Sequence, residues 1–186
     1  MNHLKKIKIS TVENKLNEPL IRGMITIGFD VSEYNTGIAI LRTTEDYLIL
    51  EQTKTIKVPK GKLFDSVDLF LTQIKDFKNE VAQKYKINLS IIEDCFYSQN
   101  VKTLKTLARF GILVYDKFRD IVEATKFVTP TQARAKVHFA KSDKKVKGKA
   151  LKKEIIAYVN YLLEIEIESE HLADSVVLAL AGLIKE

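Results

Sequence analysis

The sequence MITIGFDV, residues 24–31, has the composition of a short β-strand, with β-branched and aromatic residues leading to an aspartate. Two further apolar runs follow at hairpin spacing, Ile38–Leu41 and Tyr47–Val58. Asn35-Thr36-Gly37 separates the first run from the second, and Glu45-Asp46 separates the second from the third; both are typical turn sequences. The pattern predicts three antiparallel strands in a meander.

The rest of the chain alternates between helical and strand patterns. Apolar residues from Phe70 to Tyr85 recur at helical spacing, and Val101–Phe118 is predicted to be a second helix. Leu89–Glu93 and Ile121–Val128 are predicted to be short strands. Three helices are expected after these strands. The first starts at Pro130, the second runs from about Val146 to Leu163, and the third runs from about His171 to Ile184.

These elements predict an α/β fold. A meander followed by two strand–helix–strand crossovers gives a five-stranded mixed sheet, a three-stranded meander plus two parallel strands, with helices on both faces. We interpret residues 1–22 as an N-terminal extension, either a tail or an added strand. Residues 23–186 are expected to form a single domain.

The composition excludes several classes of protein. The chain has 186 residues, of which 46% are hydrophobic and 29% charged, which is typical of a folded domain rather than a disordered tail. Its single cysteine, Cys95, rules out an intrachain disulfide and a cysteine-based zinc site. No apolar run approaches the roughly 20 residues of a membrane-spanning helix, so no membrane partner is expected. The net charge of +6 makes a polyanionic partner plausible.

Four residues are placed where this fold could bring them together. Asp30 and Glu93 end two apolar strands, and His171 and Asp174 are three apart near the start of the last helix, so they share a face. Ligands of open α/β sheets gather at the carboxyl ends of the strands. Carboxylates held close together are costly unless a cation neutralises them, and oxygen-rich sites select Mg²⁺ or Mn²⁺.

Each of these residues also has a structural interpretation. Asp30 could form a turn with Ser32 and Asn35, and Glu93 could be a solvent-exposed charge beside Asp94. His171 and Asp174 could be ordinary first-turn residues of a helix, where the dipole favours aspartate but not histidine. The functional interpretation depends on all four residues occurring in this order on these elements.

The motifs resemble those of RuvC-type Holliday junction resolvases, which belong to the ribonuclease H-like superfamily. Ile27–Ser32 with Asn35–Gly37 resembles the first motif, and Ile91–Glu93 followed by Phe96 resembles the second, in which a metal-binding Glu precedes an aromatic residue by three. His171–Ser175 resembles the last motif, in which an acidic residue or His stands three before an Asp. The family's common Pro-Gly after the first Asp is replaced here by Val31-Ser32.

The resemblance implies an active site of Asp30, Glu93, His171 and Asp174 that holds two divalent ions, Mg²⁺ or Mn²⁺. It also implies a homodimer that cuts two strands of a four-way DNA junction symmetrically, since a two-fold dimer matches a two-fold substrate. A stripe of residues on the helix from Val101 could mediate the dimer or simply pack on the sheet; its members are Leu104, Ala108, Gly111 and Tyr115.

A basic segment between Arg134 and Lys153 is the second strong feature. It contains nine basic residues and a single acid, Asp143, so it carries charge of nearly one sign, as expected of a phosphate-binding surface. The resemblance places residues that assist catalysis here, with Arg134 and Lys149 as the best matches and Lys144 and Lys145 as alternatives. The DNA-binding residues expected from the sequence are Phe96, which could stack on unpaired bases, Arg134, Lys136, Lys144, Lys145, Lys147 and Lys149.

The sequence therefore predicts a structure-selective endonuclease that resolves four-way junctions by two-metal-ion hydrolysis of phosphodiesters. The alternatives are a broader nuclease for branched DNA or RNA and a non-catalytic junction-binding protein of the same fold. An actin-like ATPase fragment ranks lower, because no second Gly-rich hairpin follows an Asp. We expect a cytoplasmic, bacterial or phage-like setting, while an organelle or viral one stays open.

Overall fold

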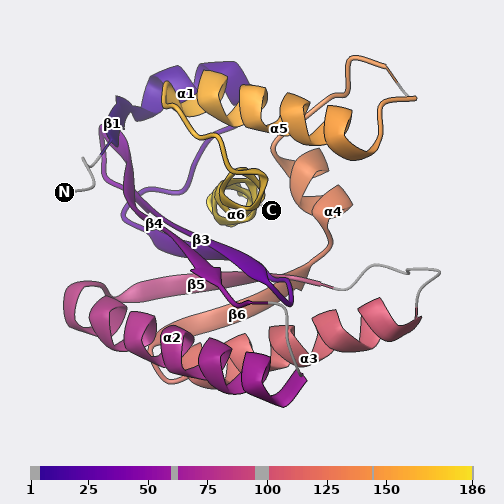
Figure 1. Cartoon of the computed structure of the whole chain (residues 1–186). Helices are drawn as coiled ribbons and strands as arrows, with labels where there is room; N and C mark the ends of the chain where they lie inside the picture. The colour runs from indigo at the N-terminus through magenta and orange to yellow at the C-terminus, as the bar shows by residue number, and fades with distance from the viewer. Residues whose placement is uncertain (1–4, 60–62, 95–100, 144, 186) are drawn as a thin grey trace.

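The protein is built around one mixed six-stranded sheet, seen in a computed structural model that describes residues 5–59, 63–94, 101–143 and 145–185 (Figure 1). The strand order is β1-β4-β3-β2-β5-β6. β1 to β4 pair antiparallel, whereas β2, β5 and β6 run parallel. The predicted α/β class is confirmed. The strands are β1 Lys5–Lys8, β2 Ile25–Asp30, β3 Asn35–Thr43, β4 Tyr47–Lys57, β5 Ile87–Glu93 and β6 Val122–Val128.

Helices cover both faces of the sheet (Figure 1). On one face α2 (Leu63–Lys84) and α3 (Val101–Phe118) pack over a core that includes Phe29, Phe70 and Phe110. On the other face a second core joins the sheet to the remaining helices, which are α1 Ile9–Leu16, α4 Pro130–Lys136, α5 Gly148–Leu163 and α6 Glu170–Ala181. Alternate residues of β2 therefore face different helical layers, and those that face α6 include Thr26, Gly28 and Asp30.

The prediction of five strands was wrong, because the N-terminal segment supplies a sixth. β1 pairs antiparallel with the edge strand β4, with Lys5 opposite Leu50. The segment then forms α1, which buries Val12 and Leu16 and lies beside α5. Of the two expectations for residues 1–22, the added strand is therefore the one observed.

The loop between β2 and β3 differs from the predicted turn at Asn35-Thr36-Gly37, because β3 already begins at Asn35. The chain reverses one step earlier, and side-chain hydrogen bonds close the turn. The Ser32 hydroxyl donates to the Asn35 carbonyl at 3.0 Å, and the Thr36 hydroxyl donates to the Ser32 carbonyl at 3.1 Å. These bonds stabilise a turn in which Val31-Ser32 stands where the family that this sequence resembles has Pro-Gly.

Two glycines let α6 approach the sheet closely. A Cβ at Gly28 would lie 2.2 Å from the Ser175 carbonyl oxygen, and one at Gly37 would lie 2.1 Å from the His171 carbonyl oxygen. Contacts this short are sterically impossible, so any side chain at either position would force the helix away. The buried Thr26 hydroxyl adds a hydrogen bond of 2.9 Å to the Ala179 carbonyl. The first turns of α6 are therefore held directly over the carboxyl end of β2.

Replacing either glycine should displace α6. Gly28→Ala and Gly37→Ala are each expected to lower the free energy of unfolding by about 1–3 kcal/mol, because the added methyl meets backbone atoms that cannot rotate away. Gly111→Ala is the matched control, since its Cβ would meet the Phe127 ring at an ordinary 3.7 Å. Chemical denaturation measures the three effects. A loss in the control equal to that in Gly28→Ala would contradict the close-approach argument.

Candidate active site at the carboxyl ends of β2 and β5

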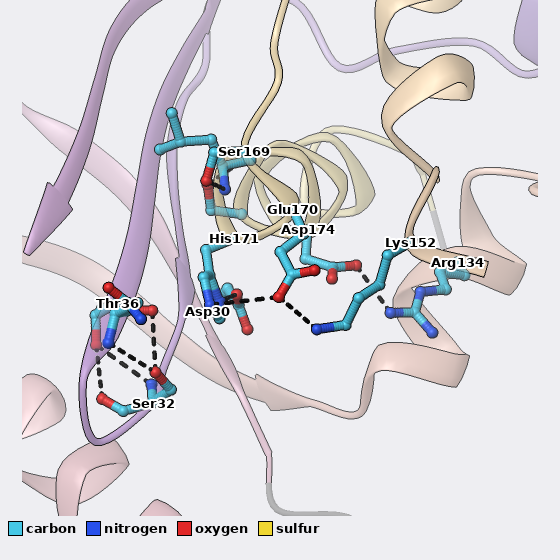
Figure 2. Close-up of polar contacts among 12 residues, drawn as sticks. Asp30, Ser32, Thr36, Arg134, Lys152, Ser169, Glu170, His171 and Asp174 are labelled. Carbon is cyan, nitrogen blue, oxygen red and sulfur yellow. Dashed lines mark hydrogen bonds and ion pairs between the residues drawn. The ribbon is translucent and has the colours of Figure 1, made fainter. Parts of the chain in front are cut away.

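The four candidate residues come from three elements that meet at one point. Asp30 ends β2 and Glu93 ends β5, and the two strands are parallel neighbours, with Phe29 opposite Ile92. His171 and Asp174 lie in the first turns of α6, on the face that packs over these strand ends. Figure 2 shows Asp30, His171 and Asp174 gathered in this region.

Short polar contacts connect the cluster. His171 Nδ1 lies 2.6 Å from Asp30 Oδ2, and the carboxyl groups of Asp30 and Glu93 hydrogen-bond to each other. Two carboxyl groups can share a hydrogen bond only when one of them carries a proton. Asp174 is instead paired with Arg134 of α4, whose Nη2 lies 2.9 Å from Asp174 Oδ1 (Figure 2).

Burial and mutual repulsion govern the protonation of this cluster. Burial raises the pKa of Asp30, and the nearby Asp174 charge adds to the effect. Burial also raises the pKa of Glu93, reinforced by the hydrogen bond and repulsion from Asp30. Burial lowers the pKa of His171, which keeps its imidazole neutral near neutral pH. The pocket thus disfavours several negative charges at once unless a cation accompanies them.

The donor set fits a hard divalent cation. Three carboxylates and a neutral imidazole are ligands that Mg²⁺ and Mn²⁺ accept. Within the described ranges, no three His, Cys, Asp or Glu side chains already converge on a common point as they would around an ion. The reason is visible in the contacts, because Asp174 is paired with Arg134 and the Asp30 and Glu93 carboxyl groups bind each other.

The contacts of Asp30 and of the start of α6 do not match the purely structural roles considered for these residues. Asp30 lies inside β2 with its side chain directed at His171, while the turn bonds are made by Ser32, Asn35 and Thr36. Asp30 is 7% exposed, so it is not a solvated turn residue. The first-turn capping role on α6 belongs to Ser169, whose hydroxyl accepts from the Leu172 amide.

The predicted DNA-binding residues are spread more widely. Arg134 lies in the site, whereas Lys136 lines a cavity of about 380 Å³ whose walls include none of the four candidate ligands. Lys145, Lys147 and Lys149 are exposed before and at the start of α5. Phe96 and Lys144 lie outside the described residues.

Two further residues belong to the site. Lys152 of α5 contributes a positive charge that acts on both Asp30 and His171. Its ammonium forms an ion pair with Glu170, the first residue of α6 (Figure 2). Sequence reasoning counted Lys152 only as part of the basic segment and gave Glu170 no role. The one available signal was the position of Glu170 directly before His171.

Acidic and imidazole side chains thus gather at the carboxyl ends of adjacent parallel strands, beneath one helix of a mixed sheet. The family model for the crossover junction endodeoxyribonuclease RuvC matches residues 26–182, so the chain belongs to this family. It is accordingly a Holliday junction-resolving endonuclease, and enzymes of this family depend on metal ions.

Solved structures share the fold. T. thermophilus RuvC in complex with a Holliday junction substrate superimposes with a TM-score of 0.61 at 17% identity, covering 85% of this chain and 91% of that one. A second Thermus thermophilus RuvC structure gives a TM-score of 0.61 at 15% identity, covering 85% of this chain and 92% of that one. The yeast mitochondrial Holliday junction resolvase Ydc2 gives 0.51 at 12% identity, covering 91% and 82%. No curated protein sequence matches the chain. No helix among the described residues is both long and apolar enough to cross a bilayer.

The raised pKa values predict how stability depends on pH without metal. A folded state with raised carboxyl pKa values binds more protons than the unfolded state. The free energy of unfolding is therefore larger at low pH and falls as the pH rises. Relative to Glu93→Gln, the wild type should lose up to about 1.4 kcal/mol of unfolding free energy per pH unit between about pH 5 and pH 8.

Denaturation in chelator, with both proteins at each pH, measures this difference. Added Mg²⁺ should stabilise the wild type more at the upper pH than at the lower one, because the cation replaces the lost protons. A difference between the two proteins that does not change with pH would contradict the buried carboxyl pair.

Proposed function

We propose that the enzyme resolves four-way DNA junctions by paired, symmetric nicks, using two divalent ions in each of the two active sites of a homodimer. The observation that carries the proposal is the gathering of Asp30, Glu93, His171 and Asp174 into one partly buried cluster. A cytoplasmic setting is part of the proposal, supported by a sequence with a single cysteine.

Each ligand has a role that follows from its place. Two divalent ions held together activate a water and stabilise the leaving oxygen of a phosphodiester, and Mg²⁺ or Mn²⁺ suits this donor set. Asp30 lies between Glu93 and His171, so it is the residue placed to serve both ions. Glu93 would hold one ion and orient the attacking water, while His171 and Asp174 would hold the other.

Basic residues supply the phosphate contacts. Arg134 and Lys152 come from α4 and α5 and act electrostatically on the carboxylates of the site, so they are placed to hold the scissile phosphate. Lys145, Lys147 and Lys149 lie farther out and would bind the phosphates of a DNA arm, an interaction that depends on salt but not on sequence. Lys136, Lys144 and Phe96 remain part of the proposed DNA surface on sequence grounds.

An exposed apolar surface on α3 and β6 supports the homodimer. One side of α3 buries Phe110, Val114 and Phe118 in the core. The other side leaves Ile112 57% exposed and Tyr115 38% exposed, beside Phe127 of β6 at 41%. Exposed apolar side chains that cluster in this way are typical of protein–protein interfaces. We name Ile112, Tyr115 and Phe127 the α3–β6 face.

The α3–β6 face also borders the active site. A hollow of about 290 Å³ runs along it, lined by Glu93, Asp94, Ala108, Gly111, Ile112 and Phe127. A second copy seated here would bring two active sites into one two-fold assembly, as the symmetry of a four-way junction requires. Of the predicted stripe, Ala108 and Tyr115 are exposed, whereas Leu104 is half-buried and Gly111 is buried.

Glu93→Gln separates catalysis from binding. The substitution preserves size but removes a charged ligand, so cleavage of a synthetic four-way junction should fall by orders of magnitude while junction affinity stays within a few-fold. Wild-type enzyme with divalent metal should produce paired nicks at symmetric positions. Parallel assays on three-way, flap and linear DNA complete the test. Equal cleavage of every substrate would indicate a broader nuclease, and undiminished cleavage by the variant would overturn the site assignment.

Ile112→Glu tests the homodimer. A carboxylate in the centre of the α3–β6 face would be buried without a partner in the dimer, so the variant should elute as a monomer in size-exclusion chromatography with light scattering. Leu69→Glu on α2 is the matched control, because Leu69 is an apolar residue 39% exposed. A wild-type monomer at all concentrations, or a dimer in both variants, would exclude this interface.

A further inference from the structure

A hollow on the α6 side of the sheet has no part in the proposed cleavage reaction. Its volume is about 380 Å³, within the range of about 300–1,000 Å³ that is usual for ligand pockets. Leu89 and Ile91 of β5 form its floor, and Val128 of β6 and Ile184, which follows α6, lie in its walls. None of the four candidate metal ligands is among its described lining residues. We call this hollow the β5–β6 groove.

A short helix and small residues leave the groove open. α4 and α6 lie on the same side of the sheet (Figure 1), but α4 has only seven residues and ends at Lys136. α6 ends at Ala181, and Gly182 follows it without a side chain. A Cβ at Gly182 would lie 3.1 Å from Ile91 Cγ1 and 3.3 Å from Leu89 Cδ2, so the backbone lies close to the floor there. The end of α6 therefore borders the groove without filling it.

Both charged side chains that line the groove are cationic. Lys126 comes from β6 and Lys136 from the last turn of α4, and no acidic residue is among the described residues around the hollow. Lys126 is exposed and Lys136 is half-buried. The other described lining residues are apolar or glycine. An occupant that complements the groove must therefore combine apolar groups with negative charge.

The groove lies on the opposite side of the sheet from the α3–β6 face. Ile91 belongs to the core between the sheet and α6, and Lys126 stands opposite it in the strand register. Phe127, the next residue, instead contacts the ring of Tyr115 on α3, with ring centroids 6.2 Å apart. Because successive side chains of a strand point to opposite faces, a partner in the groove and a second copy on the α3–β6 face use different side chains.

Segments outside the family match build one end of the groove. The RuvC model matches residues 26–182, whereas the lining residues Ile21, Met24 and Ile184 lie outside that range. The Ile21 amide donates to the Leu183 carbonyl at 2.7 Å, which joins the segment before β2 to the chain after α6. The groove is therefore built partly by residues that the family model does not include.

The chemistry of the groove favours a peptide over nucleic acid. Duplex DNA presents phosphates to lysines, but its bases are stacked inside the duplex and offer no large apolar group to cover the floor. A protein segment can bring apolar side chains that fill a pocket and acidic side chains that pair with cations at its rim. The net charge of +6 also attracts an acidic segment before contact is made.

We propose that the β5–β6 groove is a docking site for an acidic peptide segment of a partner protein. The apolar side chains of this segment cover Leu89 and Ile91, and its carboxylates pair with Lys126 and Lys136. The nuclease would thereby be held to another protein while its α3–β6 face stays available to a second copy. The inference goes beyond the proposed function, because it uses none of the candidate metal ligands.

Selection from random peptides displayed on phage tests the inference with the full chain. The peptides that the wild type retains should combine acidic with apolar residues, whereas basic or wholly polar peptides would contradict the proposal. One retained peptide, synthesised with a fluorophore, then gives a dissociation constant by fluorescence polarisation. Replacing its apolar residues by Ser, or its acidic residues by the corresponding amides, should each weaken binding by about 10-fold or more.

Charge reversal on the protein locates the bound peptide. Lys126→Glu and Lys136→Glu should each weaken binding about 5- to 10-fold, because each removes an attraction and adds a repulsion. Lys75→Glu is the matched control, since Lys75 is exposed on α2, on the other side of the sheet, and its reversal changes the net charge equally. The control should stay within about two-fold of the wild type, because charges that far apart are screened by salt.

Methyl NMR of the wild type gives a test that depends on no variant. The peptide should shift the methyl signals of Leu89, Ile91 and Ile184 and leave those of Ile112 on the α3–β6 face unchanged. Shifts confined to other residues, equal binding by all three charge variants, or a selection that retains no peptide would overturn the inference. A duplex oligonucleotide that shifts the same three residues would assign the groove to DNA and would overturn it equally.

Discussion

Two neighbouring carboxyl groups at the ends of β2 and β5, one buried and one partly buried, are the constraint on which the rest of the site depends. Asp30 and Glu93 cannot both be charged at this distance in a desolvated pocket without a compensating cation. Burial and their mutual interaction raise the pKa of both carboxyl groups. Under the proposed function, the pair that would destabilise the metal-free protein at higher pH would also favour binding of a divalent ion, because the ion would take the place of the protons.

Close packing of α6 on the sheet, rather than further charged groups, completes the surroundings of this pair. Gly28 and Gly37 remove the side chains that would otherwise keep α6 at ordinary helix-to-sheet distance. The helix then delivers His171 to Asp30 and Asp174 to Arg134. Gly28 and Gly37 therefore affect the site indirectly, because they set the distance between the sheet and the helix that carries two of the four candidate ligands.

Periodicity and turn residues predicted most of the architecture, and the two strand–helix–strand crossovers predicted the parallel strands. β1 was not recognised as a definite strand because Lys5, Lys6 and Lys8 surround a single buried Ile7, so its apolar signal is weak. The cluster was predictable because Asp30 and Glu93 end recognisable strands, while His171 and Asp174 stand near the start of a recognisable helix. The roles of Lys152 and Glu170 were not, since their contact depends on how α5 lies against α6, which no local pattern encodes. Phe96 and Lys144 lie outside the described residues.

Anomalous diffraction from crystals soaked in Mn²⁺ tests the central claim most directly. The account predicts anomalous peaks within coordination distance of Asp30, with Glu93 on one side and His171 and Asp174 on the other, and Asp174 released from Arg134. A cation bound elsewhere with these four side chains unchanged, or Asp30 and Glu93 still sharing their hydrogen bond at saturating Mn²⁺, would contradict it.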